Sequence, residues 1–373
     1  GFFSSRHAIN NIRVKKMKLL LVGPTIFPIH GQSLAFSRFE ESICESDKIV
    51  VDTNLECKSK ITKIIYSIFL LFEIMIKTLF FKYEKVYFTC SRSIFGSFKD
   101  VILINIAAYR KKKIVNHLHG SDFYEFFHAS PRWYRYILAH TYHKVDVSIV
   151  LLERMREQFR DFPNMRVEIV PNFYDEELEV SLITKSRKKV NFVYLSNIMM
   201  SKGVFELIES FKDISADYDH VSLSIAGEFM SDASMNFEET KLKFISEISG
   251  INNISYLGKV YGEEKIKLLQ RSDIFVLPSY YVSEALPISI IEAMACGNAI
   301  ITSNHKYLPD LISESNGLLA EPKSVSSLSE CFRTLLMDLS LVKKMQRYNT
   351  LHAKKMYSLD KYIKKLKGII ESC

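Results

Sequence analysis

Short apolar runs alternate with longer amphipathic segments along the first 170 residues of the chain. The runs are rich in Val, Ile, Leu and aromatic residues, which is typical of buried strands, whereas the longer segments have helical spacing. The predicted strands are 18–22, 85–89, 114–119, 146–151 and 167–170, and the predicted helices are 33–46 and 96–109. This alternation predicts a mostly parallel sheet with helices on both faces.

The alternation stops at a polar stretch, residues 173–190, and then starts again. The predicted strands are 192–195, 222–226, 254–257, 274–277 and 299–302, and the predicted helices are 204–212, 238–249, 263–271, 288–296, 325–338 and 341 onward. The chain is therefore expected to hold two Rossmann-like doubly wound α/β domains, 17–172 and 191–355, facing a central cleft. A final helix, 356–373, could cross back to the first domain. Residues 1–16 lack the apolar region of a signal peptide and are interpreted as a leader or tag.

Composition excludes several classes of protein. Apolar residues make up 47% of the chain, far more than in a disordered segment, and 13 Gly and 9 Pro are too few for a collagen-like or low-complexity chain. Six scattered cysteines show no zinc-binding spacing, which favours free thiols in a reducing compartment. Residues 1–170 hold 26 Lys and Arg against 16 Asp and Glu, whereas residues 171–373 hold 24 against 26. A basic first half favours an anionic partner, such as a membrane surface, a phosphate-bearing substrate or nucleic acid.

The apolar segment 64–81 has two interpretations. It contains Glu73 and Lys77, which argues against a helix that spans a bilayer. A buried domain helix is one interpretation, and a helix docked at a membrane interface is the other. The basic run Arg110–Lys113 and the charge of the first half favour an anionic acceptor or membrane near this domain.

Ligands of open α/β sheets bind beyond the carboxyl ends of the strands, where helix N-termini offer free N–H groups to phosphates. In the junction 277–297, Pro287 suits the first turn of a helix, and N–H groups near Leu286–Ile288 could hold a phosphate. Glu284 lies in the loop before this helix and Glu292 lies about one turn into it. Both carboxylates could accept hydrogen bonds from sugar hydroxyls. Two solvated surface glutamates are the alternative.

Three further junctions are candidates for binding. Lys202 lies at the start of a predicted helix, where a cation is unfavourable for the helix itself. An anionic ligand would explain a lysine at this position, and an exposed lysine without a ligand is the alternative. In the first domain, Gly31 lies between the first strand and the first helix and could let the backbone approach a phosphate. His119 and Asp122 follow another strand, where a structural histidine is the alternative to a functional one.

Together these residues resemble the retaining GT-B glycosyltransferases of the family-4 type, which includes bacterial glycogen synthases and lipopolysaccharide and capsule glycosyltransferases. The family's E-x7-E element matches Glu284 and Glu292, followed by the small-residue run Ala293–Gly297. Its strand–Lys–Gly–helix element matches 195–204, and 225–228 and 256–260 resemble its glycine turn and base-binding strand. Asn197 stands where the family often has Arg, and Ala285 replaces the usual Gly.

The resemblance implies residue roles. Glu284 and His119 would contact the donor sugar at the reacting centre. Donor-binding positions would be Gly31, Gln32, Ser33, Asn197, Lys202, Gly203, Gly227, Glu228, Val260, Leu286, Pro287, Ile288 and Glu292. Contacts with the acceptor or with a membrane are expected at Asp122, Arg110, Lys111, Lys112 and Lys113.

The implied activity is transfer of a sugar, with retention, from a nucleotide sugar (UDP favoured over GDP) to a glycan or polyprenyl-linked acceptor of bacterial O-antigen, lipopolysaccharide or capsule synthesis. No metal, no other cofactor and no nucleic-acid partner are expected, and the implied location is the cytoplasmic side of the inner membrane, bound peripherally. Two alternatives stay open: a sugar-nucleotide epimerase with the same fold, and a non-catalytic nucleotide or nucleic-acid binding protein.

Overall fold

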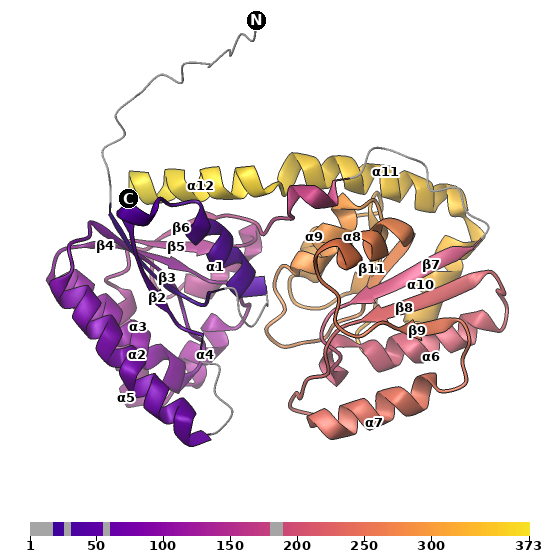
Figure 1. The fold of residues 1–373 in the computed structure, drawn as a ribbon, viewed down its shortest axis with the longest axis horizontal. Coiled ribbons are helices and arrows are strands. Elements are labelled where there is room, and N and C mark those ends of the chain that lie inside the picture. The colour runs from indigo at the N-terminus through magenta and orange to yellow at the C-terminus, as the bar shows by residue number, and fades with distance from the viewer. Residues whose placement is uncertain (1–17, 26–30, 55–59, 180–188) are drawn as a thin grey trace, which may run out of the picture.

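The computed structural model describes residues 18–25, 31–54, 60–179 and 189–373. These residues form two α/β domains that lie side by side, each built on a six-stranded sheet (Figure 1). Every pair of neighbouring strands in the described residues is parallel. The predicted pair of doubly wound domains is therefore confirmed. The proposed leader 1–16 lies outside the described residues.

The first sheet has the strand order β2-β1-β3-β4-β5-β6. Its strands are β1 (Leu19–Gly23), β2 (Lys48–Asp52), β3 (Lys85–Thr89), β4 (Lys113–His117), β5 (Val147–Val150) and β6 (Arg166–Ile169). Its helices are α1 (Gly31–Glu41), α2 (Lys60–Phe80), α3 (Ile94–Tyr109), α4 (Phe123–Ala129) and α5 (Arg132–Tyr142). Because side chains alternate along a strand, Leu19 and Leu21 pack with α1, whereas Leu20 and Val22 share a core with α2, α3 and α5.

The second sheet has the order β12-β11-β10-β7-β8-β9. Its strands are β7 (Val190–Leu195), β8 (Val221–Ala226), β9 (Ile254–Tyr256), β10 (Ile274–Leu277), β11 (Ala299–Ser303) and β12 (Gly317–Ala320). Its helices are α6 (Val204–Ser215), α7 (Phe237–Ile248), α8 (Gly262–Arg271), α9 (Ile288–Ala295), α10 (Val325–Met337) and α11 (Leu339–Met356). The strands β10 and β11 are buried throughout, as expected for a parallel sheet covered on both faces.

The last helix, α12 (Leu359–Ser372), lies against the first domain although it follows the second in the chain (Figure 1). Its apolar face packs with α1 and with the same sheet face as Leu19 and Leu21. The crossing is fixed where Tyr174 N donates to the Tyr357 carbonyl over 3.0 Å. Of the predicted connection 173–190, residues 180–188 lie outside the described residues, and β7 begins at Val190.

Some predicted elements differ from the structure. The helix predicted at 33–46 is α1, which begins at Gly31 and ends at Glu41, because the chain then turns to form β2, a strand that was not predicted. The helices α4 and α5 and the strand β12 were also not predicted.

The interpretation of 64–81 as a buried helix is wrong. In α2 only one side of the helix is buried, with Ile74 at its centre, and the opposite side carries large exposed apolar residues. These exposed residues include Ile61, Ile64, Ile65, Tyr66, Ile68, Phe69, Phe72, Ile76 and Phe80. Among the described residues, no helix combines the length and apolar character needed to cross a bilayer.

Candidate active site between the two domains

A cavity of about 620 Å³ lies where the carboxyl edges of the two sheets meet. Nine of the predicted site residues line it: Gly31, Gln32, His119, Asn197, Lys202, Glu284, Leu286, Pro287 and Ile288. The first two come from α1, His119 follows β4, Ile288 begins α9, and the rest come from connections between strands and helices of the second domain. The volume suits a small organic ligand, because ligand pockets are typically about 300–1,000 Å³.

Two helix N-termini face each other across this cavity. The helix α1 begins at Gly31, and α9 begins at Ile288 after Pro287. A side-chain carbon placed on Gly31 would lie 3.8 Å from the Ile288 side chain, so the two ends come close together. No side chain caps α9, which leaves N–H groups of its first turn to a ligand. Two helix dipoles therefore favour an anion at this point.

Lys202 and Glu284 form an ion pair at the cavity wall. Lys202 Nζ donates to Glu284 Oε2 over 2.7 Å, and the two side chains are only 13% and 8% exposed. Ser279 Oγ donates to the same oxygen over 2.5 Å. Lys202 also lies over the Tyr281 ring, 4.9 Å from its centroid. The carboxylate is thereby held in one position, with a cation beside it that can also reach an anionic ligand.

The position of Lys202 depends on the glycine that follows it. Gly203 has a φ of +74°, and a side-chain carbon there would lie 2.2 Å from the Pro278 carbonyl oxygen. We expect Gly203→Ala to lower the free energy of unfolding by about 2–3 kcal/mol. The strain of an alanine in the left-handed backbone region and its clash with the Pro278 carbonyl both destabilise the folded state. Urea denaturation measures this. Gly250→Ala is the control, since Gly250 has a φ of +77° in open space. Equal losses in the two variants would contradict the clash.

His119 lines the cavity, and His117 lies behind it. The two imidazole rings are 4.0 Å apart between centroids, and His117 Nδ1 shares a hydrogen bond with the Tyr87 hydroxyl over 2.6 Å. Burial, with a smaller effect from His119, holds the pKa of His117 well below its usual range. His117 is therefore neutral in the folded protein, and its uncharged ring packs against His119.

This buried histidine predicts a pH effect on stability. An unfolded chain takes up a proton on His117 near pH 6.5, whereas the folded protein does not, so acidification favours the unfolded state. From this residue we expect a loss of about 1.4 kcal/mol in the free energy of unfolding per pH unit below pH 6.5. Urea denaturation at several pH values should show a shallower dependence in His117→Gln. His220→Gln, which changes a half-exposed histidine, should keep the wild-type slope, and three equal slopes would contradict the assignment.

Glu292 lies one turn into α9 and is 3% exposed. Its Oε1 accepts a hydrogen bond from Lys265 Nζ over 2.5 Å, a partner that was not predicted. Burial raises the pKa of Glu292, and Lys265 opposes this shift. Glu292 does not line the cavity itself, but it is four residues after Ile288, so both lie on the same side of α9.

Several predicted donor-binding residues do not line the cavity. Ser33 is buried within α1, and Gly227 packs against the Ser196 carbonyl. Glu228 forms an ion pair with Lys259 over 2.7 Å. Gly203 and Val260 also lie outside the lining.

The basic run Arg110–Lys113 lies away from the cavity. Residues 110–112 precede β4 and Lys113 begins it, so the run lies at the amino edge of the first sheet. Arg110 donates to the carbonyls of Thr78 and Phe81 at the end of α2, over 2.7 and 2.8 Å. Lys112 lies over the Tyr83 ring, Lys113 pairs with Asp146, and Lys111 occupies a turn with a φ of 55°.

Arg92 follows β3 and lines the cavity, and it was not among the predicted residues. Arg92 forms an ion pair with Asp122, whose Oδ2 accepts from Ser283 Oγ of the second domain over 2.5 Å. Its position just beyond the carboxyl end of a predicted strand is the signal that could have found it. Arg92 brings a second cation to the cavity, and Asp122 connects the two domains.

A loop of the second domain, 230–233, also lines the cavity and was not predicted. Asp232 orders it by accepting from the backbone N–H groups of Ser201 and Ser234 over 2.7 and 2.8 Å. Burial alone would raise the pKa of Asp232, but these N–H groups lower it. The loop is therefore held next to Lys202.

No set of three His, Cys, Asp or Glu side chains among the described residues is arranged to hold a metal ion. The sequence contains one D-x-D tripeptide, Asp217–Asp219. It lies in the turn between α6 and β8, at the edge of the sheet opposite the cavity, and the Asp219 side chain is fully exposed.

Comparison with known proteins agrees with this architecture. The fold is GT-B: HepE from Anabaena, solved in complex with UDP, superimposes with a TM-score of 0.74 over 96% of this chain and 100% of that chain, at 14% identity. Residues 176–352 match the model for glycosyl transferases group 1. This match begins before β7 and ends within α11, so it covers nearly the whole second domain.

Two relatives show how far the similarity extends. The chain is 34% identical over 152 residues to the N,N'-diacetylbacillosaminyl-diphospho-undecaprenol α-1,3-N-acetylgalactosaminyltransferase of Campylobacter jejuni, covering 40% of this chain and 36% of that enzyme. An uncharacterized glycosyltransferase of Methanocaldococcus jannaschii is 22% identical over 321 residues, 81% of this chain and 79% of that protein. The stronger similarity is thus confined to about a third of the bacterial relative's length.

Proposed function

We propose that this protein is a retaining glycosyltransferase that moves a sugar from a nucleoside diphosphate sugar to a glycan or glycolipid acceptor in bacterial surface polysaccharide synthesis. The observation that carries the proposal is the meeting of Lys202, Glu284 and the N-terminus of α9 in one cavity between the domains. A cation and a helix dipole suit a diphosphate, and a fixed carboxylate suits sugar hydroxyls. A UDP-sugar is the favoured donor, in keeping with the UDP bound to HepE.

The proposed chemistry uses the diphosphate as leaving group. Lys202 and the N–H groups of α9 would stabilise the charge that develops on it, which does not require a metal ion. His119 and Glu284 would hold the donor sugar. The acceptor hydroxyl would bond to the anomeric carbon on the face from which the diphosphate leaves, as the bond to the diphosphate breaks, and its proton would pass to the departing diphosphate oxygen, giving retention. Glu292 would bind the ribose, one turn further along α9.

Thermal shift with UDP, GDP, ADP and CDP tests the donor site. A ligand at about 100 times its Kd stabilises a protein by roughly 2.7 kcal/mol, so one nucleotide should raise the melting temperature clearly. The shift should be lost in Glu292→Gln. Lys241→Gln, an exposed change on α7, is the control that should keep it. No shift with any of the four would contradict the proposal, and turnover of a sugar nucleotide without any acceptor would favour an epimerase.

We also propose that the acceptor is carried on a lipid and that the first domain binds an anionic bilayer peripherally, at the inner leaflet. The outer sides of α2, α3 and α5 support this, because they form one layer on the first sheet (Figure 1). Besides α2, this layer exposes Phe95 of α3 and Trp133 and Tyr136 of α5, which are 89%, 62% and 76% accessible. Aromatic and apolar residues with nearby cations are typical of helices that lie in a membrane interface. The name of the relative from Campylobacter jejuni includes diphospho-undecaprenol, a lipid that carries a diphosphate and is therefore both apolar and anionic.

The cations of this surface differ from the predicted basic run. Lys63 of α2, Lys82 just after it and Arg132 of α5 are exposed, and no ion pair is found for them within the described residues. They flank the apolar side chains and could contact anionic headgroups, each contributing about 1 kcal/mol near a charged surface.

A further inference from the structure

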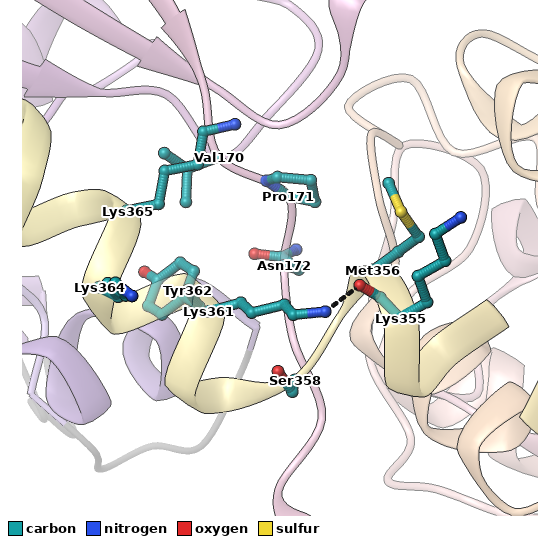
Figure 2. Close-up of a pocket in the computed structure, with 10 residues that line it drawn as sticks. All are labelled: Val170, Pro171, Asn172, Lys355, Met356, Ser358, Lys361, Tyr362, Lys364 and Lys365. Carbon is teal, nitrogen blue, oxygen red and sulfur yellow. Dashed lines mark hydrogen bonds between the residues drawn. The ribbon is translucent and has the colours of Figure 1, made fainter. Parts of the chain in front are cut away.

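A second cavity, of about 390 Å³, lies between the two domains on the side of the crossing helix. The segment Val170–Asn172 forms one wall, and the end of α11 and the first two turns of α12 form the others (Figure 2). It is distinct from the active-site cavity, and Asn172 lines both. Neither the family resemblance nor the site described above gives it a role.

Four lysines surround this cavity: Lys355, Lys361, Lys364 and Lys365. Lys361 donates to the Lys355 carbonyl (Figure 2). In the described part of the chain, none of the four forms an ion pair, although their neighbour Lys354 pairs with Glu179 over 2.8 Å. Like charges held around one cavity repel each other, and an anion between them would remove that repulsion.

Two further features of the cavity suit a ligand. The helix α12 begins here, and its N-cap residue Ser358 makes no capping hydrogen bond, so N–H groups of the first turn are open to an anion. Asn172 is 5% exposed, and its Oδ1 has no hydrogen-bond partner among the described residues. Figure 2 shows this oxygen on the side of α12. A buried amide oxygen without a donor is costly, and a ligand hydroxyl would satisfy it.

We propose that this cavity binds a small phosphate monoester that carries at least one hydroxyl group. The phosphate would lie among the lysines at the start of α12, and the hydroxyl would donate to Asn172 Oδ1. The volume fits a molecule of this size, because ligand pockets start at about 300 Å³. A soluble sugar phosphate and a lipid headgroup share this chemistry.

The cavity is connected to the donor site by one hydrogen bond. Asn172 Nδ2 donates to the Leu286 carbonyl over 2.7 Å, and Leu286 belongs to the loop that leads into α9. A ligand that fixes Asn172 would therefore stabilise the arrangement of that loop. This coupling, which rests on the proposed function, makes the phosphate monoester a regulator of donor binding.

Isothermal titration calorimetry of the full chain at constant ionic strength tests the site, with glucose 6-phosphate, glycerol 3-phosphate and inorganic phosphate as probes. One of the two esters should bind more tightly than inorganic phosphate. Lys361→Gln/Lys365→Gln should weaken that binding at least about tenfold, because the variant removes two of the cations that would contact the phosphate. Lys343→Gln/Lys344→Gln, two exposed lysines of α11 outside the cavity, should leave it unchanged. Preference for glycerol 3-phosphate would identify a lipid headgroup as the source, and preference for glucose 6-phosphate a soluble ester.

Three results would overturn the site: no binding of any probe, equal weakening by both double variants, or competition of the ester with UDP. Coupling is measured separately, as the Kd of UDP with and without saturating ester, which should differ about fivefold or more in the wild type and not in Lys361→Gln/Lys365→Gln. An unchanged Kd would overturn the coupling alone. If UDP does not bind at all, the proposed donor site is wrong. Binding of the ester still tests the second cavity in that case.

Discussion

Replacing Lys202 by Gln is expected to weaken the binding of UDP about 10- to 100-fold, which corresponds to the 1.5–3 kcal/mol of a hydrogen bond to a charged group. Lys202 is 13% exposed and its Nζ is the cation nearest to Glu284 at the cavity wall. The variant removes this cation and leaves the Glu284 carboxylate buried without its charge partner, next to the place proposed for the diphosphate. Both changes act against an anionic ligand. Calorimetric titration with UDP gives the change in Kd directly.

A double variant separates these two contributions. In Lys202→Gln/Glu284→Gln no buried charge is left unpaired, so the free energy of unfolding should recover relative to the single variant. UDP affinity should recover only in part, because the cation is still absent. Lys212→Gln, whose wild-type lysine pairs with Glu247 at 35% exposure, is the control and should bind UDP like the wild type. Wild-type affinity in Lys202→Gln would contradict the role of Lys202.

The general position of the site could be predicted, because the carboxyl ends of parallel strands meet at one edge of a sheet. This rule placed Lys202 and Glu284, which are 82 positions apart in the chain, near the same cleft. Their direct ion pair could not be predicted, since it depends on the side-chain conformations at the ends of β7 and β10. The pairing of Glu292 with Lys265 of α8 was missed for the same reason.

Exposure was the property that the sequence predicted least well. The segment 64–81 is apolar on nearly every side, so its periodicity does not show which side faces the core. Only the packing of α2 against α3 leaves Phe69 and Phe72 at the surface. In the same way, the contact of Asn172 with Leu286 depends on how the two domains lie together, which no local pattern specifies.

The second large effect concerns this surface: Phe69→Asp/Phe72→Asp is expected to reduce binding to anionic vesicles at least about 100-fold. Phe69 and Phe72 are 67% and 53% exposed and three residues apart, so they lie on one side of α2. Burying a phenylalanine contributes about 1.5–3 kcal/mol, and the variant removes two of them while adding two negative charges. The free energy of unfolding should stay within about 0.5 kcal/mol of the wild type, because neither side chain belongs to the core.

Sedimentation with phosphatidylglycerol-containing vesicles measures the partition, and a matched pair in the second domain provides the control. Leu242 and Ile245 of α7 are 69% and 48% exposed and also three residues apart, so Leu242→Asp/Ile245→Asp makes the same chemical change on a surface with no proposed membrane role. If only the α2 pair loses binding, the outer side of α2 is the membrane-binding surface. Part of that binding should persist at high salt, because burial of apolar surface is not screened, whereas attraction between Lys63, Arg132 and the headgroups is. Equal losses in both pairs would instead indicate that net charge alone governs binding, and the apolar surface would then need another occupant.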